Sequence, residues 1–117
     1  MSAGFAVQSG LNYCAGDQDF YLEMLTGYAE SYDKQISELN TAMEADDLRQ
    51  YEILVHALKS VSRTVGADDV SEFARALESA AKNDDRAFIS SHHGEFVSLY
   101  GSKTAALRKL LQNDEPD

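Results

Sequence analysis

Apolar residues recur every three or four positions along most of this chain, which is the spacing of one buried face of a helix. The first such run starts after Asp17, a suitable N-cap, and continues to Met43. The segment 31–33 is either a kink in one long helix or the boundary between two helices. The pattern is compatible with both.

Three more helices are predicted, over about 47–66, 70–81 and 85–112. Gly66 ends the first of them, because glycine is common just beyond a helix C-terminus. An acidic pair stands at the start of each of the three helices: Asp46–Asp47, Asp68–Asp69 and Asp84–Asp85. Capping and the helix dipole explain these pairs, so we assign them no catalytic role.

Four amphipathic helices joined by short loops predict an all-α fold, an antiparallel up-down four-helix bundle. We expect a single domain over 1–117, with a short helix or arm over 1–16, the bundle over 17–112 and an acidic tail over 113–117. The tyrosines of the first run are expected in the core: Tyr21, Tyr28 and Tyr32.

Composition narrows the functional classes. The formal net charge is −10 with a pI near 4.6, which disfavours binding to nucleic acid or to an anionic membrane. Cys14 is the only cysteine, so neither an intrachain disulfide nor a cysteine-rich metal site can form. No signal peptide or membrane-spanning run is recognisable, and we expect a cytoplasmic protein.

The predicted helix over 47–66 carries the candidate chemistry. At roughly 100° per residue, its apolar positions cluster around Leu58, whereas His56 points about 160° away from that residue, toward water. The clustered positions are Tyr51, Leu54, Val55, Val61 and Val65. An exposed imidazole is largely neutral near pH 7 and can attack an acyl phosphate without an activating base.

The neighbours of His56 suit phosphoryl transfer. Lys59 lies one turn along and Arg63 lies further on the same side, where positive charge would favour a bound phosphoryl group. Ser60 is small enough to leave room for a partner beside the ring. Ile53 is apolar on a polar face, which indicates a surface covered in a complex.

Simpler interpretations exist for each of these features. A histidine on the wet face of a helix is usually an ordinary surface residue, and single exposed aliphatic side chains are common. His92 and His93 raise the alternative of a metal-binding bundle, but adjacent helical residues point about 100° apart and cannot chelate one ion together. Spacing alone therefore does not decide the function.

The whole stretch resembles the histidine-containing phosphotransfer (HPt) domain. That family carries a segment His-x-Leu-Lys-small-x-Ser-x-x-x-Gly-Ala, and this sequence matches it from His56 to Ala67. The pair Leu77–Glu78 and the entry Gly16–Asp17 followed by Phe20-Tyr21-Leu22 also fit. The resemblance covers nearly all of the chain.

The resemblance implies that His56 is the phosphorylated residue and Lys59 the cation beside the phosphate. Ser60 takes a small-residue position where glycine is commoner in the family. Glu78 takes a supporting position near the imidazole, where it either repels the phosphate or accepts a hydrogen bond from the ring.

The same resemblance implies a phosphorelay carrier in two-component signalling, without autonomous catalytic activity. Its partners would be receiver domains, which bring the Mg²⁺, and a hybrid sensor histidine kinase of which this chain could be a module. We expect no cofactor or metal on the chain itself, a monomer, and a docking surface that includes Ile53, Ser60 and Arg63. The alternative is a non-phosphorylated helical adaptor that binds a receiver or kinase domain.

Overall fold

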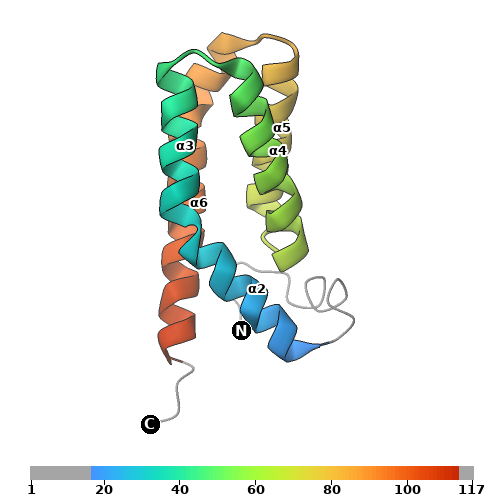
Figure 1. The fold of residues 1–117 in the computed structure, drawn as a ribbon, viewed down its shortest axis with the longest axis vertical. Helices are drawn as coiled ribbons and strands as arrows, with labels where there is room; N and C mark the ends of the chain where they lie inside the picture. Colours follow the sequence, from blue (N-terminus) through green and yellow to red (C-terminus); the bar gives the residue numbers. More distant parts are fainter. Residues whose placement is uncertain (1–16, 114–117) are drawn as a thin grey trace.

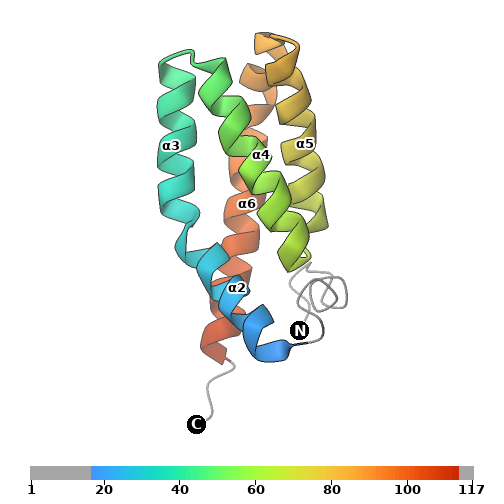
Figure 2. The ribbon, with the colours of Figure 1, turned by 45° about the vertical axis from the view of Figure 1, so that its right-hand side comes forward.

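A computed structural model describes residues 17–113, and over these residues it is all-helical without a strand. The helices are α2 (Gln18–Glu30), α3 (Tyr32–Glu44), α4 (Leu48–Val65), α5 (Asp68–Lys82) and α6 (Arg86–Asn113). Helices α3 to α6 lie lengthwise beside one another, and α2 crosses obliquely at the lower end (Figures 1 and 2). The all-α prediction is confirmed.

Both ends of the predicted domain extend beyond the described residues. The expected arm over 1–16 and the residues 114–117 of the expected tail lie outside the described residues. Asn113, which we expected to start the tail, is instead the last residue of α6.

The first apolar run consists of two helices rather than one kinked helix. Ser31 ends α2 and precedes α3, and its hydroxyl donates a 3.0 Å hydrogen bond to the carbonyl oxygen of Tyr28. The change of direction at this residue lets α2 leave the axis of α3 and pack across the end of the other helices (Figure 2).

Three aspartates cap helices as predicted. Carboxylate oxygens of Asp17, Asp47 and Asp85 each accept a backbone N–H three residues further on, at 3.1 Å. The prediction is wrong for α5, whose N-cap is Ala67 and has no side-chain hydrogen bond. Asp68 and Asp69 lie in the first turn of α5 instead, where negative charge complements the helix dipole.

The remaining two aspartates of the acidic pairs do something else. Asp46 and Asp84 have positive φ angles of 53° and 57°, and both carboxylates bind the guanidinium of Arg86. The Nε atom of Arg86 lies 3.0 Å from Oδ1 of Asp46. This cluster ties the α3–α4 turn to the start of α6, so capping does not fully explain the pairs.

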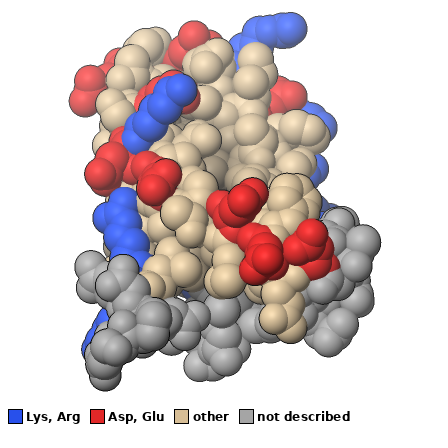
Figure 3. Space-filling view, turned by 60° about the horizontal axis from the view of Figure 1, so that its bottom comes forward, with Lys and Arg blue, Asp and Glu red and all other residues tan. Residues whose placement is uncertain are grey.

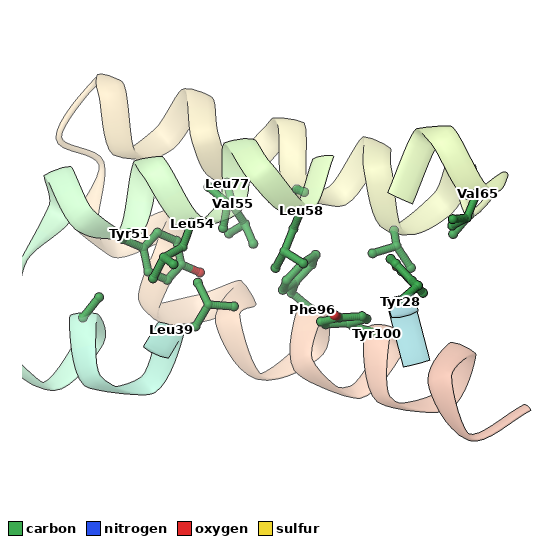
Figure 4. Packing of buried hydrophobic residues seen from close by; sticks show 14 of the residues in the cluster. Tyr28, Leu39, Tyr51, Leu54, Val55, Leu58, Val65, Leu77, Phe96 and Tyr100 are labelled. Carbon is green, nitrogen blue, oxygen red and sulfur yellow. The ribbon is translucent and has the colours of Figure 1, made fainter. Parts of the chain in front are cut away.

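The core forms between α4, α6 and the helices beside them (Figure 4). The predicted apolar face of α4 is buried except for Val61, which is half-buried: Tyr51, Leu54, Val55, Leu58 and Val65. Ser62, four residues after Leu58 and therefore on the same face of the helix, is also fully buried, and its Oγ lies 2.7 Å from the hydroxyl of Tyr28.

The tyrosines of α2 fasten that helix to α4. Besides the contact of Tyr28 with Ser62, the hydroxyl of Tyr21 donates a 2.8 Å hydrogen bond to the carbonyl oxygen of Val65. Both side chains are buried, as expected, whereas Tyr32 is only half-buried. These bonds fix the lower half of α4, the helix that carries His56.

Two glycines in α6 have different environments. A Cβ at Gly101 would lie 2.7 Å from the hydroxyl oxygen of Tyr32, whereas a Cβ at Gly94 would meet nothing within 4 Å. Gly101 therefore makes room for a packed ring, and Gly94 has no such reason in the described residues.

We expect Gly94→Ala to raise the free energy of unfolding by about 0.5–1 kcal/mol, the usual gain of alanine over glycine in a helix. Gly101→Ala should lower it by about 1 kcal/mol or more, because Tyr32 must move. Urea unfolding measures both. A Tyr32→Phe background removes the close oxygen and should relieve the Gly101→Ala penalty; an unrelieved penalty would contradict this explanation.

Candidate functional site

His56 lies on the outer face of α4, on the side opposite Leu58, as predicted. Its side chain is 59% exposed, while Leu58 is completely buried. Its Nδ1 atom lies 2.6 Å from Oε2 of Glu78, which α5 supplies. The imidazole is thus accessible and also fixed from one edge.

Glu78 is a buried carboxylate shared between two side chains of α4. Its side chain is only 6% exposed, and its Oε1 accepts a 2.7 Å hydrogen bond from Nζ of Lys59. Burial by itself would raise the pKa of Glu78. The hydrogen bonds from Lys59 and His56, together with the positive charge of Lys59, outweigh burial, so the pKa lies below its ordinary value and the group is ionised.

The contact with Glu78 sets the proton position on His56. An ionised carboxylate can only accept a hydrogen bond, so the ring donates from Nδ1. In a neutral imidazole this leaves the lone pair on Nε2, the nitrogen not used by Glu78. The arrangement presents a nucleophilic nitrogen to an incoming group.

Lys82 is a third charged residue at the site, and the sequence analysis missed it. Its Nζ atom lies 3.6 Å from Oε2 of Glu78, one helical turn away on α5. The spacing of four residues between Glu78 and Lys82 was a usable signal once Glu78 was assigned to the site. Two ammonium groups against one carboxylate leave the cluster with net positive charge beside His56.

Other parts of the surface are acidic. The exposed residues of α2 include Asp19, Glu23 and Glu30, and this helix contains no lysine or arginine. Figure 3 shows acidic side chains on the lower end of the molecule, with basic ones mainly at its margins. The net positive charge of the cluster formed by Lys59, Glu78 and Lys82 therefore contrasts with the acidic surface of α2.

The residues predicted for partner binding lie on the same helix as His56 and are exposed. Ile53 is 52% exposed, and Ser60 and Arg63 are also exposed. Ile53 and Ser60 lie three and four residues from His56, so they share its face of α4. Ile53 and Ser60 therefore flank the imidazole, and Arg63 lies seven residues after His56, two turns along the same face.

His92 and His93 have separate partners. Nδ1 of His92 donates to the carbonyl oxygen of Phe88 at 2.9 Å, and its ring stacks on that phenyl ring. His93 lies between the hydroxyl of Tyr51 and Oδ1 of Asn40, at 2.9 and 3.0 Å. Burial lowers the pKa of His93. No group of three His, Cys, Asp or Glu side chains able to hold a metal occurs within residues 17–113.

The family model of the Hpt domain matches residues 23–113. The chain belongs to the Hpt domain family. Membership supports a phosphotransfer role in two-component signalling.

One curated relative and one solved structure are similar to this chain. The chain is 29% identical over 84 residues to the phosphorelay intermediate protein rdeA of Dictyostelium discoideum, covering 72% of this chain and 33% of that protein. It thus spans about a third of that relative's length. The HPT domain of a sensor hybrid histidine kinase from Shewanella shares the fold with a TM-score of 0.85, at 17% identity, over 97% of this chain and 98% of that domain.

No helix within residues 17–113 combines the length and the apolar character needed to cross a bilayer.

The lowered pKa of Glu78 predicts a pH dependence of stability. The folded state releases this proton more readily than the unfolded state, whose value is near 4.5. Pairing of Glu78 therefore contributes fully above that value, and the contribution is lost as pH falls through the lower folded pKa. In urea unfolding, the stability difference between wild type and Glu78→Gln should be largest above about pH 5 and shrink below it. A difference independent of pH would contradict the ionised pairing.

Proposed function

We propose that His56 accepts a phosphoryl group from the aspartyl phosphate of one receiver domain and passes it to another. The observation that carries this proposal is the 2.6 Å contact between Nδ1 of His56 and buried Glu78, which leaves Nε2 free of that contact on an exposed ring. Membership of the Hpt family supports the same reaction class.

The reaction is a displacement at phosphorus. The lone pair on Nε2 forms the N–P bond while the bond between phosphorus and the aspartate oxygen breaks, which returns a carboxylate to the receiver. The ring retains its Nδ1 proton and gains positive charge. Glu78 lies against that nitrogen and stabilises the developing charge, so it acts as a positioning and electrostatic residue.

Lys59 and Lys82 offset the electrostatic repulsion expected between Glu78 and a phosphoryl group. An ammonium has three N–H donors, so Lys59 can keep its bond to Glu78 and still donate to a phosphoryl oxygen. Lys82 adds a second positive charge on the α5 side. Transfer depends mainly on such positioning and charge compensation, since the chemistry itself requires no other group from this chain.

The proposed docking surface is the exposed face of α4 around His56, including Ile53, Ser60 and Arg63. The receiver would supply the Mg²⁺ and the acidic residues that hold it. We infer a monomeric carrier in the cytoplasm without autonomous catalysis, in which α3 to α6 act as an antiparallel four-helix bundle. We infer a hybrid sensor histidine kinase as a second class of partner, in addition to receiver domains.

The deciding experiment is incubation with a purified receiver domain that has been phosphorylated on its aspartate. We expect an acid-labile, base-stable label on the wild-type chain and none on His56→Gln. His92→Gln is the matched control and should be labelled like wild type. Binding of the receiver without any label would instead support the adaptor alternative, and a label that survives in His56→Gln would remove His56 from the reaction.

Bulk beside His56 tests the docking surface. We expect Ser60→Trp to reduce the transfer rate at least about tenfold, because an indole one turn from the ring blocks the approach of a receiver. Ser98→Trp, at an exposed position of α6, should leave the rate unchanged. Equal rates in the two tryptophan variants would show that the partner approaches from another side.

A further inference from the structure

Lys59 forms hydrogen bonds to α5 through both its side chain and its backbone. Its Nζ atom bonds to Oε1 of Glu78 at 2.7 Å, and its backbone carbonyl oxygen accepts a 2.9 Å hydrogen bond from Oγ of Ser71. Ser71 and Glu78 are seven residues apart on α5, which places them two turns apart on one face. One face of α5 therefore forms hydrogen bonds with both the backbone and the ammonium group of Lys59.

The Ser71 bond differs from the threonine hydroxyl bonds of the described helices. The hydroxyls of Thr26, Thr41 and Thr64 each bond to a carbonyl four residues back in their own helix. Ser71 instead crosses from one helix to another, and it is only 6% exposed. A buried bond of this kind restrains how α5 lies against α4 rather than the helix that contains it.

The acceptor of this bond is well suited to the role. A carbonyl oxygen has two lone pairs, so the oxygen of Lys59 can take part in its own helix and still accept from Ser71. A long lysine side chain loses much rotamer freedom when its ammonium is fixed. The hydrogen bond from Ser71 restrains the backbone of Lys59, and this reduces the number of positions that the ammonium group can occupy.

We propose that Ser71 is a positioning residue for phosphoryl transfer: it fixes the backbone of Lys59 so that the ammonium stays between Glu78 and the phosphoryl group on His56. This inference rests on the proposed function of His56 and Lys59, and adds a residue that touches neither the phosphoryl group nor the receiver. Its action passes through Lys59.

A double-mutant cycle tests this route. We expect Ser71→Ala to lower the rate of transfer from a phosphorylated receiver domain about threefold to tenfold, the size of effect that one lost hydrogen bond produces. In a Lys59→Ala background the same substitution should change the rate less than about twofold, because the side chain that Ser71 positions is gone. Ser71→Thr keeps the hydroxyl and should restore most of the rate.

The controls separate positioning from general stability. Thr64→Ala removes a hydroxyl bond within α4 and should leave the rate unchanged. Ser71→Cys has nearly the volume of serine with a weaker donor, so it reports on the bond if Ser71→Ala does not fold. An equal loss of rate from Ser71→Ala with and without Lys59 would overturn the proposal, as would an unchanged rate in a folded variant.

A second measurement does not depend on phosphoryl transfer. In ¹⁵N NMR spectra of the unphosphorylated chain, the Nζ signal of Lys59 should report a hydrogen-bonded ammonium in wild type and faster proton exchange in Ser71→Ala. Failure of the proposed function would appear as wild-type chain that takes no label, with this NMR difference intact. Failure of the Ser71 inference would appear as labelled wild type with identical Lys59 signals in both proteins.

Discussion

A buried carboxylate must be paired, and the pairing of Glu78 is the constraint on which the site depends. Glu78 comes from α5, and both of its closest partners, His56 and Lys59, come from α4. The requirement to satisfy this one charge therefore fixes the two helices against each other at the level of the imidazole. It also fixes the ring proton on Nδ1 and holds the ammonium of Lys59 on the same carboxylate that binds the ring. One pairing thus sets geometry, protonation and charge together.

The rest of the fold makes that pairing possible. Gly66, in the left-handed region with φ of 89°, ends α4, and α5 follows after Ala67, so the two helices pack as close neighbours. On the other side, Tyr21 and Tyr28 tie α2 to the last turns of α4. The outer face of α4 is left accessible while its inner face is secured by core packing and by buried hydroxyl bonds. A reacting group on such a face is held by a rigid element rather than by a loop.

The spacing of apolar residues predicted the features that are determined within a single helix. The buried face of α4 and the exposure of His56 follow from an angle per residue, and both are confirmed. Contacts between two helices could not be predicted from this spacing. From the sequence, Glu78 could either repel the phosphate or accept a hydrogen bond from the imidazole. Only the packing of α5 on α4 brings its Oε2 atom to Nδ1 of His56. Ser62 and Ser71 lie on the buried faces of their helices, but the hydroxyl or carbonyl partner that each finds on another helix could not be predicted from one helix alone.

A phosphoryl carrier has a further requirement, which the charges at this site meet. A group that bound the phosphoryl too strongly would not release it to the next receiver, since only differences between states favour transfer. In the proposed transfer, Glu78 stabilises the positive charge that the ring gains, but its own negative charge opposes the phosphoryl oxygens. Lys59 and Lys82 oppose that repulsion without removing the carboxylate. In the proposed transfer, attraction by the two lysines and repulsion by Glu78 therefore both act on the phosphoryl group, and the repulsion limits how tightly the lysines hold it.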